Sequence, residues 1–302
     1  MGRNKKRGVI VLKKIGFIGL GTMGESMCEN VIKKSGYEVS VFDINPVQID
    51  KLVNAGGIRV SSIKEIGENC SIIIIMVPKS EHVKAVISDL LTSIRPGTLI
   101  VDMSTIEPEV SKELSAKVKE AGGYMVDAPV VKSKPAAIKA ELGIYVGGAK
   151  EIYDKLLPIL SCMGSNIIYM GDNGCGLAMK ICHNMLVAQI QNGVNEMFVL
   201  AQASGIDFQD ATAAISYGGG QNFYLDSKKD DILASNFSPK FSVENMHKDI
   251  NIAISLAAKL NLKLKGAEVS QGVYAKSMED KLGKEDFCAT YKVVKETSRL
   301  SK

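Results

Sequence analysis

Residues 14 to 24, Lys14-Ile-Gly-Phe-Ile-Gly-Leu-Gly-Thr-Met-Gly24, decide the fold that the sequence predicts. A short apolar run leads directly into a Gly-x-Gly-x-x-Gly turn, and a helix is expected to follow it. In such a strand–turn–helix unit, Gly19 permits the tight turn, Gly21 lets backbone approach a pyrophosphate, and Gly24 allows close packing of helix on strand. The helix N-terminus then meets the phosphate charge. The turn residues predicted to bind a dinucleotide are Gly19, Gly21, Thr22, Met23 and Gly24.

An acidic residue downstream supports the same interpretation. A second apolar run ends in Asp43, nineteen residues after Gly24, where a carboxylate can bond both ribose hydroxyls. Asp43 also repels a 2′-phosphate, and no arginine follows it in Ile44-Asn45-Pro46, so NAD (NADH) is favoured over NADP. The alternative is a glycine turn that only packs a helix and an aspartate that only caps one.

The hydrophobic pattern predicts an α/β chain, with a Rossmann-type doubly wound parallel sheet followed by an all-α domain. Short β-branched runs alternate with amphipathic stretches up to about residue 169, which is typical of βαβ units. After Gly171 the strand-like runs vanish and helical periodicity continues. The expected parts are a basic leader over 1–12, an NAD-binding domain over 13–170, and an all-α substrate and oligomerisation domain over 171–302 that begins with a long interdomain helix. The expected strands are Lys14–Gly19, Glu38–Asp43, Ser71–Val77, Thr98–Met103, Gly123–Ala128, Gly143–Gly147 and Asn166–Tyr169.

Composition restricts the partners that we expect. The 302 residues carry a net charge of only +4, which gives little reason to invoke nucleic acid or an anionic membrane, so a small anionic substrate is expected. The six cysteines lack the spacing of a zinc site or a disulfide scaffold, which predicts reduced thiols in a cytoplasmic protein. Three histidines without ligand spacing give no case for a metal. The basic leader is expected to be a solvated tail; a targeting remnant or a nucleic-acid contact are the alternatives.

Five motifs resemble, in order and spacing, those of the β-hydroxyacid dehydrogenases. This family includes 3-hydroxyisobutyrate dehydrogenase, tartronate semialdehyde reductase, γ-hydroxybutyrate dehydrogenases and sulfolactaldehyde reductases. The resemblance covers about residues 13 to 296, and it implies hydride transfer between NAD and a small hydroxy compound or its semialdehyde. It also implies a homodimer or homotetramer. The motifs are Gly16–Gly24, Asp102-Met-Ser-Thr105, Asp127-Ala-Pro-Val130, Gly174-Cys-Gly-Leu-Ala-Met-Lys180 with Asn184, and Lys248-Asp249.

Lys180 and Asn184 are the candidate catalytic residues. They lie four apart on the predicted long helix, so both side chains project from one face, toward the expected crevice between the domains. Oxidation of an alcohol needs a base and reduction of an aldehyde needs the same group as an acid, and a lysine whose pKa is lowered by burial suits both. Asn184 is expected to hold the amine or the reacting oxygen. Taken alone, the pair is more typical of a snorkelling lysine and a capping asparagine; the resemblance reverses this and implies catalysis.

Further site residues follow from the resemblance. Ser104 and Thr105, after a predicted strand, are implied to face the nicotinamide and the substrate, although a hydroxyl pair there is also an ordinary helix cap. Lys248 matches a lysine that relatives direct at the cofactor, and alone it would be surface charge. Val77, at the end of another predicted strand, completes the expected cofactor-binding set.

One departure from the family pattern bears on the substrate. After Val130 the family has Ser-Gly-Gly, a loop that receives a carboxylate, whereas this chain has Val131, Lys132 and Ser133. The lysine adds positive charge at the anion site, and sulfolactaldehyde reductases similarly carry an arginine and a hydroxyl residue there. His183 also departs, since many relatives have asparagine at that place.

These departures favour reduction of a three-carbon semialdehyde that bears a sulfonate, as in a sulfolactaldehyde reductase that forms 2,3-dihydroxypropane-1-sulfonate. The expected substrate contacts are Ser104, Val131, Lys132, Ser133, His183 and Asn184. Three alternatives stay open. Lys132 could point to solvent or pair with Glu141; the enzyme could act on 3-hydroxyisobutyrate, γ-hydroxybutyrate or tartronate semialdehyde; or the chain could be a non-catalytic NAD-binding module, against which Lys180 argues.

Overall fold

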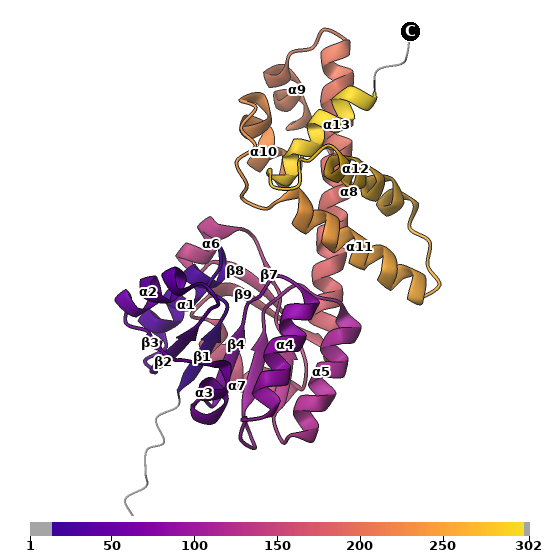
Figure 1. The fold of residues 1–302 in the computed structure, drawn as a ribbon. Coiled ribbons are helices and arrows are strands. Elements are labelled where there is room, and N and C mark those ends of the chain that lie inside the picture. Colours follow the sequence, from indigo (N-terminus) through magenta and orange to yellow (C-terminus); the bar gives the residue numbers. More distant parts are fainter. Residues whose placement is uncertain (1–13, 299–302) are drawn as a thin grey trace, which may run out of the picture. The chain divides into compact units, whose positions relative to one another are not determined.

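The computed structural model describes residues 14–298, so the basic leader predicted over residues 1–12 lies outside the described range. The chain divides into two compact units between Ala178 and Met179, and each unit is described by itself (Figure 1). The predicted domain boundary near residue 170 coincides with the end of the last strand. The division of the contacts falls a few residues later, inside the first long helix of the all-α part.

The first unit is built on a sheet whose first six strands are parallel. Their order, β3-β2-β1-β4-β5-β6, runs outward from β1 in both directions, which is the doubly wound arrangement that the sequence predicts. Between residues 14 and 178 the strands are β1 (Ile15–Ile18), β2 (Val39–Phe42), β3 (Ile58–Arg59), β4 (Ile72–Ile75), β5 (Leu99–Asp102), β6 (Tyr124–Asp127), β7 (Val130–Val131), β8 (Leu142–Gly147) and β9 (Gly164–Gly171).

The predicted parallel sheet is confirmed for β1 to β6, and one edge adds antiparallel pairing. Strand β8 runs antiparallel to β6 and β7, and β9 then pairs parallel to β8. The reason lies in the connection, because only residues 132 to 141 separate β7 from β8. A parallel crossover needs a dozen or more residues, whereas a shorter connection suffices to reverse the chain.

Helices cover both faces of this sheet (Figure 1). Successive residues of β4 show why: Ile72 and Ile74 belong to one apolar core cluster, whereas Ile73 and Ile75 belong to the other. Side chains of a strand alternate between faces, so an unbroken isoleucine run requires cover on both. The helices are α1 (Gly24–Lys34), α2 (Pro46–Asn54), α3 (Ile63–Asn69), α4 (Ser80–Leu91), α5 (Pro108–Glu120), α6 (Lys134–Lys139) and α7 (Lys150–Leu160).

The regular elements of the second unit are all helices over its described part, residues 179–298, and loops and one isolated bridge between Ser242 and Asp286 join them. Its core includes Phe198 of the long helix, whose ring stacks on Phe208 at 3.8 Å, and the fully buried Tyr274. This bears out the predicted all-α domain after the sheet. The helices are α8 (Cys175–Ala203), which begins in the first unit, α9 (Phe208–Ile215), α10 (Phe223–Leu233), α11 (Val243–Lys259), α12 (Lys265–Glu279), a 3-10 turn over Phe287–Ala289, and α13 (Thr290–Thr297).

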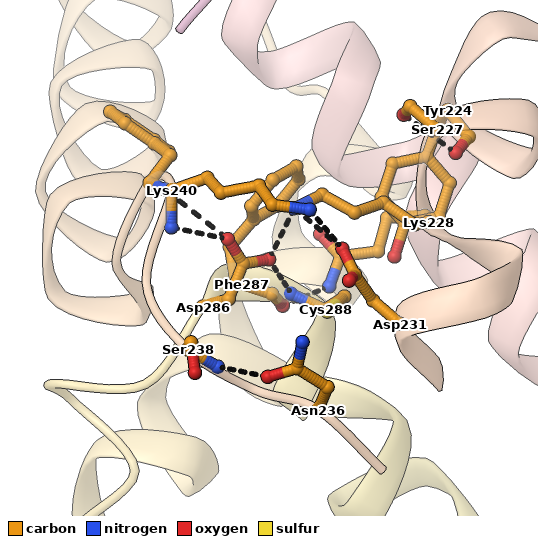
Figure 2. Close-up of polar contacts among 12 residues, drawn as sticks. Tyr224, Ser227, Lys228, Asp231, Asn236, Ser238, Lys240, Asp286, Phe287 and Cys288 are labelled. Atoms are coloured by element: carbon orange, nitrogen blue, oxygen red, sulfur yellow. Dashed lines mark hydrogen bonds and ion pairs between the residues drawn. The ribbon is translucent and has the colours of Figure 1, made fainter. Parts of the chain in front are cut away.

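A buried ion pair fixes the chain that leads into α11 (Figure 2). Lys228 of α10 donates to Asp286 at 2.7 Å, and the other carboxylate oxygen accepts the backbone N–H groups of Lys240 and Phe241. Burial acts to raise the pKa of the Asp286 carboxyl, but the bond and charge of Lys228, together with the bonds from Cys288 and Lys240, lower that pKa below its ordinary value. Breaking such a pair leaves an uncompensated buried charge, so the Asp286 carboxylate stays beside Lys228. Through its two backbone bonds, this carboxylate holds residues 240 and 241 in place before α11 begins.

Residues 14–298 contain neither a membrane-spanning helix nor a cluster of metal ligands. None of the helices in this range is both long and apolar enough to cross a membrane. The same range holds no cluster of three or more His, Cys, Asp and Glu side chains that could bind a metal ion. The six cysteines, all within it, form no disulfide.

Candidate active site

The glycine turn has the shape of a phosphate cradle. Gly19 has a φ of +94°, and a Cβ atom there would lie 2.2 Å from the carbonyl oxygen of Met76. A Cβ atom on Gly24 would lie 2.0 Å from the carbonyl oxygen of Gly19, so neither glycine can be replaced without moving backbone. A Cβ atom on Gly21 would instead meet nothing within 4 Å. Backbone N–H groups at the start of α1 are therefore open to an approaching pyrophosphate, beside the exposed Thr22.

Asp43 is bonded to the same turn. One carboxylate oxygen accepts the Leu20 N–H at 2.6 Å, and the other accepts the Asn45 N–H at 2.8 Å. The residue therefore has a structural role beside the predicted ribose binding, but it caps neither helix, since the N-cap positions of α1 and α2 are Met23 and Asn45. The two roles are compatible, because each carboxylate oxygen can accept a further hydrogen bond from a ribose hydroxyl. Ile44, which follows it, is 95% exposed and offers an apolar surface beside this carboxylate.

Val77 and Ser104 meet at the carboxyl ends of β4 and β5. The Ser104 hydroxyl oxygen accepts the Val77 N–H at 3.0 Å, and the Ser104 N–H donates to Asp102 at 3.0 Å. Ser104 is fully buried, so its hydroxyl supports the loop after β4 and is not displayed at the surface. Thr105, the next residue, is half-buried and the more accessible of the two. This edge of a parallel sheet is where ligands bind in open α/β folds.

The loop over residues 131–133, here called the anion loop, exposes one charged side chain, that of Lys132. Val131 is buried at the end of β7, Lys132 is exposed, and Ser133 is the N-cap position of α6. The backbone of Lys132 has a φ of +78°, the left-handed region that suits the family's glycine and disfavours lysine. Within residues 14–298 Lys132 has no ion pair, so the alternative pairing with Glu141 is not present.

Lys180 and Asn184 lie together on α8, one turn apart. The Lys180 Nζ donates to the Asn184 side-chain oxygen at 3.2 Å, and both residues are buried. Burial disfavours the ammonium and lowers the pKa of Lys180 to about 8; the charge of Asp249 opposes this shift and that of Lys248 adds to it. A lysine with such a pKa exchanges a proton readily near neutral pH.

Asp249 is a site residue to which the sequence analysis assigns no role. The Asn184 amide donates to one of its oxygens at 2.6 Å, and the Lys248 Nζ lies 3.2 Å from the other. Four side chains, from Lys180 through Asn184 and Asp249 to Lys248, thus form one chain between α8 and α11. A signal was available, since Asp249 lies in the apolar stripe that includes Met246, where only a paired acid is tolerated.

His183 lies three residues after Lys180, which places it on the same side of α8. It is half-buried, and burial together with the nearby charge of Lys180 lowers its pKa below the ordinary histidine value. The imidazole is therefore neutral at pH 7, so it would donate or accept hydrogen bonds without adding charge.

Asp127 explains the glycines that precede Lys180. Its buried carboxylate accepts the N–H of Gly174 at 2.6 Å and that of Leu177 at 2.8 Å, which caps the first turn of α8. A Cβ atom on Gly176 would lie 2.8 Å from this carboxylate and 2.4 Å from the carbonyl oxygen of Tyr145. Burial raises the pKa of Asp127 to about 6, although the amides oppose this. This bond ties the start of the lysine-bearing helix to the sheet, which is why the first unit extends to Ala178.

Family models match both parts of the chain. Residues 14–171 match the NAD-binding domain of 6-phosphogluconate dehydrogenase, and residues 174–294 match the NAD-binding model of NADP-dependent 3-hydroxyisobutyrate dehydrogenase. The two models meet at the start of α8. The matches therefore show an NAD(P)-binding protein.

Relatives and solved structures agree with these models. The chain is 32% identical to mitochondrial 3-hydroxyisobutyrate dehydrogenase of Rattus norvegicus, over 93% of this chain and 87% of that protein. It is 31% identical to the NAD-dependent L-serine dehydrogenase of Pseudomonas aeruginosa, over 93% and 98%. The structure of Mycobacterium tuberculosis 3-hydroxyisobutyrate dehydrogenase with L-serine superposes with a TM-score of 0.88, at 29% identity and over 94% and 99% of the two chains. The chain therefore belongs to the β-hydroxyacid dehydrogenase family, as an NAD(P)-dependent dehydrogenase of the 3-hydroxyisobutyrate type that acts on a CH–OH group.

Proposed function

We propose that this enzyme reduces sulfolactaldehyde, a three-carbon semialdehyde with a sulfonate group, to 2,3-dihydroxypropane-1-sulfonate. The single observation that carries the choice of substrate is Lys132, an exposed ammonium that has no ion-pair partner within residues 14–298. It lies in the loop that the family resemblance implies receives the substrate anion. NADH, when bound, would supply the hydride that the aldehyde carbon needs. Lys180 supplies the proton to the aldehyde oxygen, so that the C=O bond becomes CH–OH.

The acid–base role of Lys180 is supported by its surroundings. A pKa of about 8 leaves most of the lysine protonated at pH 7, yet lets it lose a proton at small cost. Asn184 accepts one of the three ammonium hydrogens and so limits the orientation of the group. Asp249 in turn fixes the Asn184 amide. In the oxidative direction the neutral amine would take the hydroxyl proton.

The proposed cofactor is NADH rather than NADPH. Asp43 supports this choice, because its carboxylate lies beside the glycine turn and would repel a 2′-phosphate. The glycine turn, Val77 and Thr105 are the proposed cofactor contacts of the first unit. Lys248, which pairs with Asp249, is the proposed contact of the second.

Steady-state kinetics with matched variants test the proposed substrate. Wild type is expected to have a higher kcat/KM for sulfolactaldehyde than for methylmalonate, tartronate and succinate semialdehydes. Lys132→Ala should lower the sulfolactaldehyde value roughly 10- to 100-fold, the range expected for one charge-assisted hydrogen bond. Lys139→Ala, which removes an exposed lysine at the far end of α6, is the control and should change little. A preference for carboxylate semialdehydes that survives Lys132→Ala would contradict the proposal.

A second candidate rests on the relatives. Proteins named 3-hydroxyisobutyrate dehydrogenase and L-serine dehydrogenase resemble this chain over most of its length, so oxidation of 3-hydroxyisobutyrate or L-serine is the alternative function. Oxidation assays with NAD and each of these compounds separate the two candidates. Saturable turnover of either compound at a kcat/KM above that of the sulfonate substrate would favour the alternative.

We also propose that the enzyme works as a homodimer or homotetramer in the cytoplasm, without nucleic acid or membrane as a partner. The outer face of α8 supports self-association, because the exposed Leu186, Gly193 and Leu200 recur every seven residues. The pattern is symmetric about Gly193, so a two-fold axis there would bring Leu186 of one copy to Leu200 of another. Light scattering during gel filtration should give the mass of a dimer or tetramer, and a monomer would contradict this.

A further inference from the structure

We propose that Asn30 is a positioning residue for the anion loop, residues 131–133. Asn30 lies in α1, is 7% exposed, and has no place in the cofactor turn or the anion loop. Its side-chain amide donates to the carbonyl oxygens of Ala137 at 2.8 Å and Ile138 at 3.2 Å, more than one hundred residues along the chain. This inference rests on the proposed function, because it assumes that Lys132 binds the substrate anion.

The bonds of Asn30 meet a need of α6. The last carbonyl groups of any helix lack partners within the helix, and α6, with six residues, is too short to be stable alone. Asn30, whose amide also donates to Ser26 in its own helix, provides a donor for the Ile138 carbonyl and a second donor for that of Ala137, which already accepts the Ala140 N–H at 3.2 Å. The amide therefore holds the end of α6 against α1, where a buried apolar residue would remove both of these long-range bonds.

The bonds of Asn30 bear on the substrate because α6, which they hold, begins directly after the loop that contains Lys132. The helix begins at Lys134, directly after the loop, and the loop contains the unfavourable left-handed backbone of Lys132. A strained residue of this kind persists only when its surroundings hold it. Pairing of Val131 with Gly143 holds one end of the loop, and α6 holds the other. Asn30 thus fixes the loop to α1, the helix that opens in the phosphate turn.

The expected effect of losing this bond is specific to the anion. Asn30→Ala should let α6 and the loop move, so that the KM for the anionic semialdehyde rises about tenfold while the Kd for NADH changes less than about twofold. A residue that served the fold alone would lower the melting temperature and affect both ligands alike. Asn69→Ala is the control, since Asn69 also donates to a carbonyl, that of Glu65 within α3, without contact to α6.

A double-mutant cycle tests the inference. Asn30→Ala, Lys132→Ala and the double variant are compared with wild type, with the KM for sulfolactaldehyde and the Kd for NADH as readouts; Asn30→Ser, which keeps a hydroxyl donor, replaces the alanine variant if that does not fold. If Asn30 acts through the loop, Asn30→Ala should change the KM less than about twofold once Lys132 is absent. If the two substitutions raise KM by factors that multiply in the double variant, or if Asn30→Ala leaves KM unchanged, this inference is wrong while the proposed function stands. An unchanged KM in Lys132→Ala would overturn the proposed function, and this inference with it.

Discussion

The side-chain amide of Asn184 donates to the Asp249 carboxylate at 2.6 Å, and this bond joins the helix that carries Lys180 to the helix that carries Lys248. Asp249 is almost fully buried and also pairs with Lys248. Its negative charge and the positive charge of Lys248 act on the pKa of Lys180 in opposite directions. Asp249 and Lys248 therefore influence the pKa of Lys180, in addition to any contact that they make with ligands.

Two neighbouring substitutions should move the pH profile in opposite directions. Asp249→Asn removes a charge that raises the pKa of Lys180, so the pH at which kcat for aldehyde reduction falls to half should decrease. Lys248→Met removes a charge that lowers the same pKa, so that pH should increase. The measurement is kcat against pH at saturating substrate and NADH. Shifts of the same sign, or none, would show that these charges do not act on the catalytic group.

The wild-type enzyme should show mirrored pH dependences in its two directions. Reduction needs the ammonium of Lys180 and should decline as the pH rises through about 8, whereas oxidation needs the neutral amine and should increase. Positive charge on the oxidised cofactor disfavours the ammonium further, so the midpoint for oxidation should lie below that for reduction. Initial rates in both directions across pH 6 to 10 check this. Coincident profiles would argue for a different acid–base group.

Removal of the buried charge should stabilise the protein. The pKa of Lys180 is lowered from 10.5 to about 8, so the folded state at pH 7 carries a charge that costs about 3 kcal/mol. Lys180→Met should have a larger free energy of unfolding than wild type at pH 7. The wild type regains this stability as pH rises from about 8 toward 10.5, so the difference should shrink over that window. Urea denaturation at several pH values measures it, and a less stable variant at pH 7 would contradict the assignment.

The cofactor preference should depend on Asp43. Asp43→Ala removes both the ribose acceptor and the charge that would repel a 2′-phosphate, so the ratio of kcat/KM for NADH to that for NADPH should fall about tenfold or more. Asp50→Ala is a suitable control, because this exposed aspartate of α2 pairs with Arg59 and should leave the ratio unchanged. An unaltered ratio in Asp43→Ala would leave the carboxylate with only its structural role.

Features that depend on neighbours in the sequence were predictable. The glycine turn follows from a six-residue motif, and the contact of Lys180 with Asn184 follows from the spacing of four on a helix. The parallel half of the sheet follows from the alternation of β-branched and amphipathic runs.

Features that depend on packing between distant parts of the chain could not be predicted from the sequence. The bond from Asn184 to Asp249 spans 65 residues and exists only because α8 and α11 pack together. The reversal of β8 depends on the length of a connection that contains the short α6, which the hydrophobic pattern does not reveal. The left-handed backbone of Lys132 could not be predicted, because glycine, the residue that usually indicates a positive φ, is absent at this position.

The kcat of Lys180→Ala in aldehyde reduction tests the central claim most directly. It should be measured beside wild type at saturating sulfolactaldehyde and NADH, with the Kd for NADH determined for both proteins. If Lys180 is the general acid, kcat should fall roughly 10²- to 10⁴-fold while NADH binding is retained. A variant that keeps the wild-type kcat would contradict the assignment of Lys180 as the proton donor.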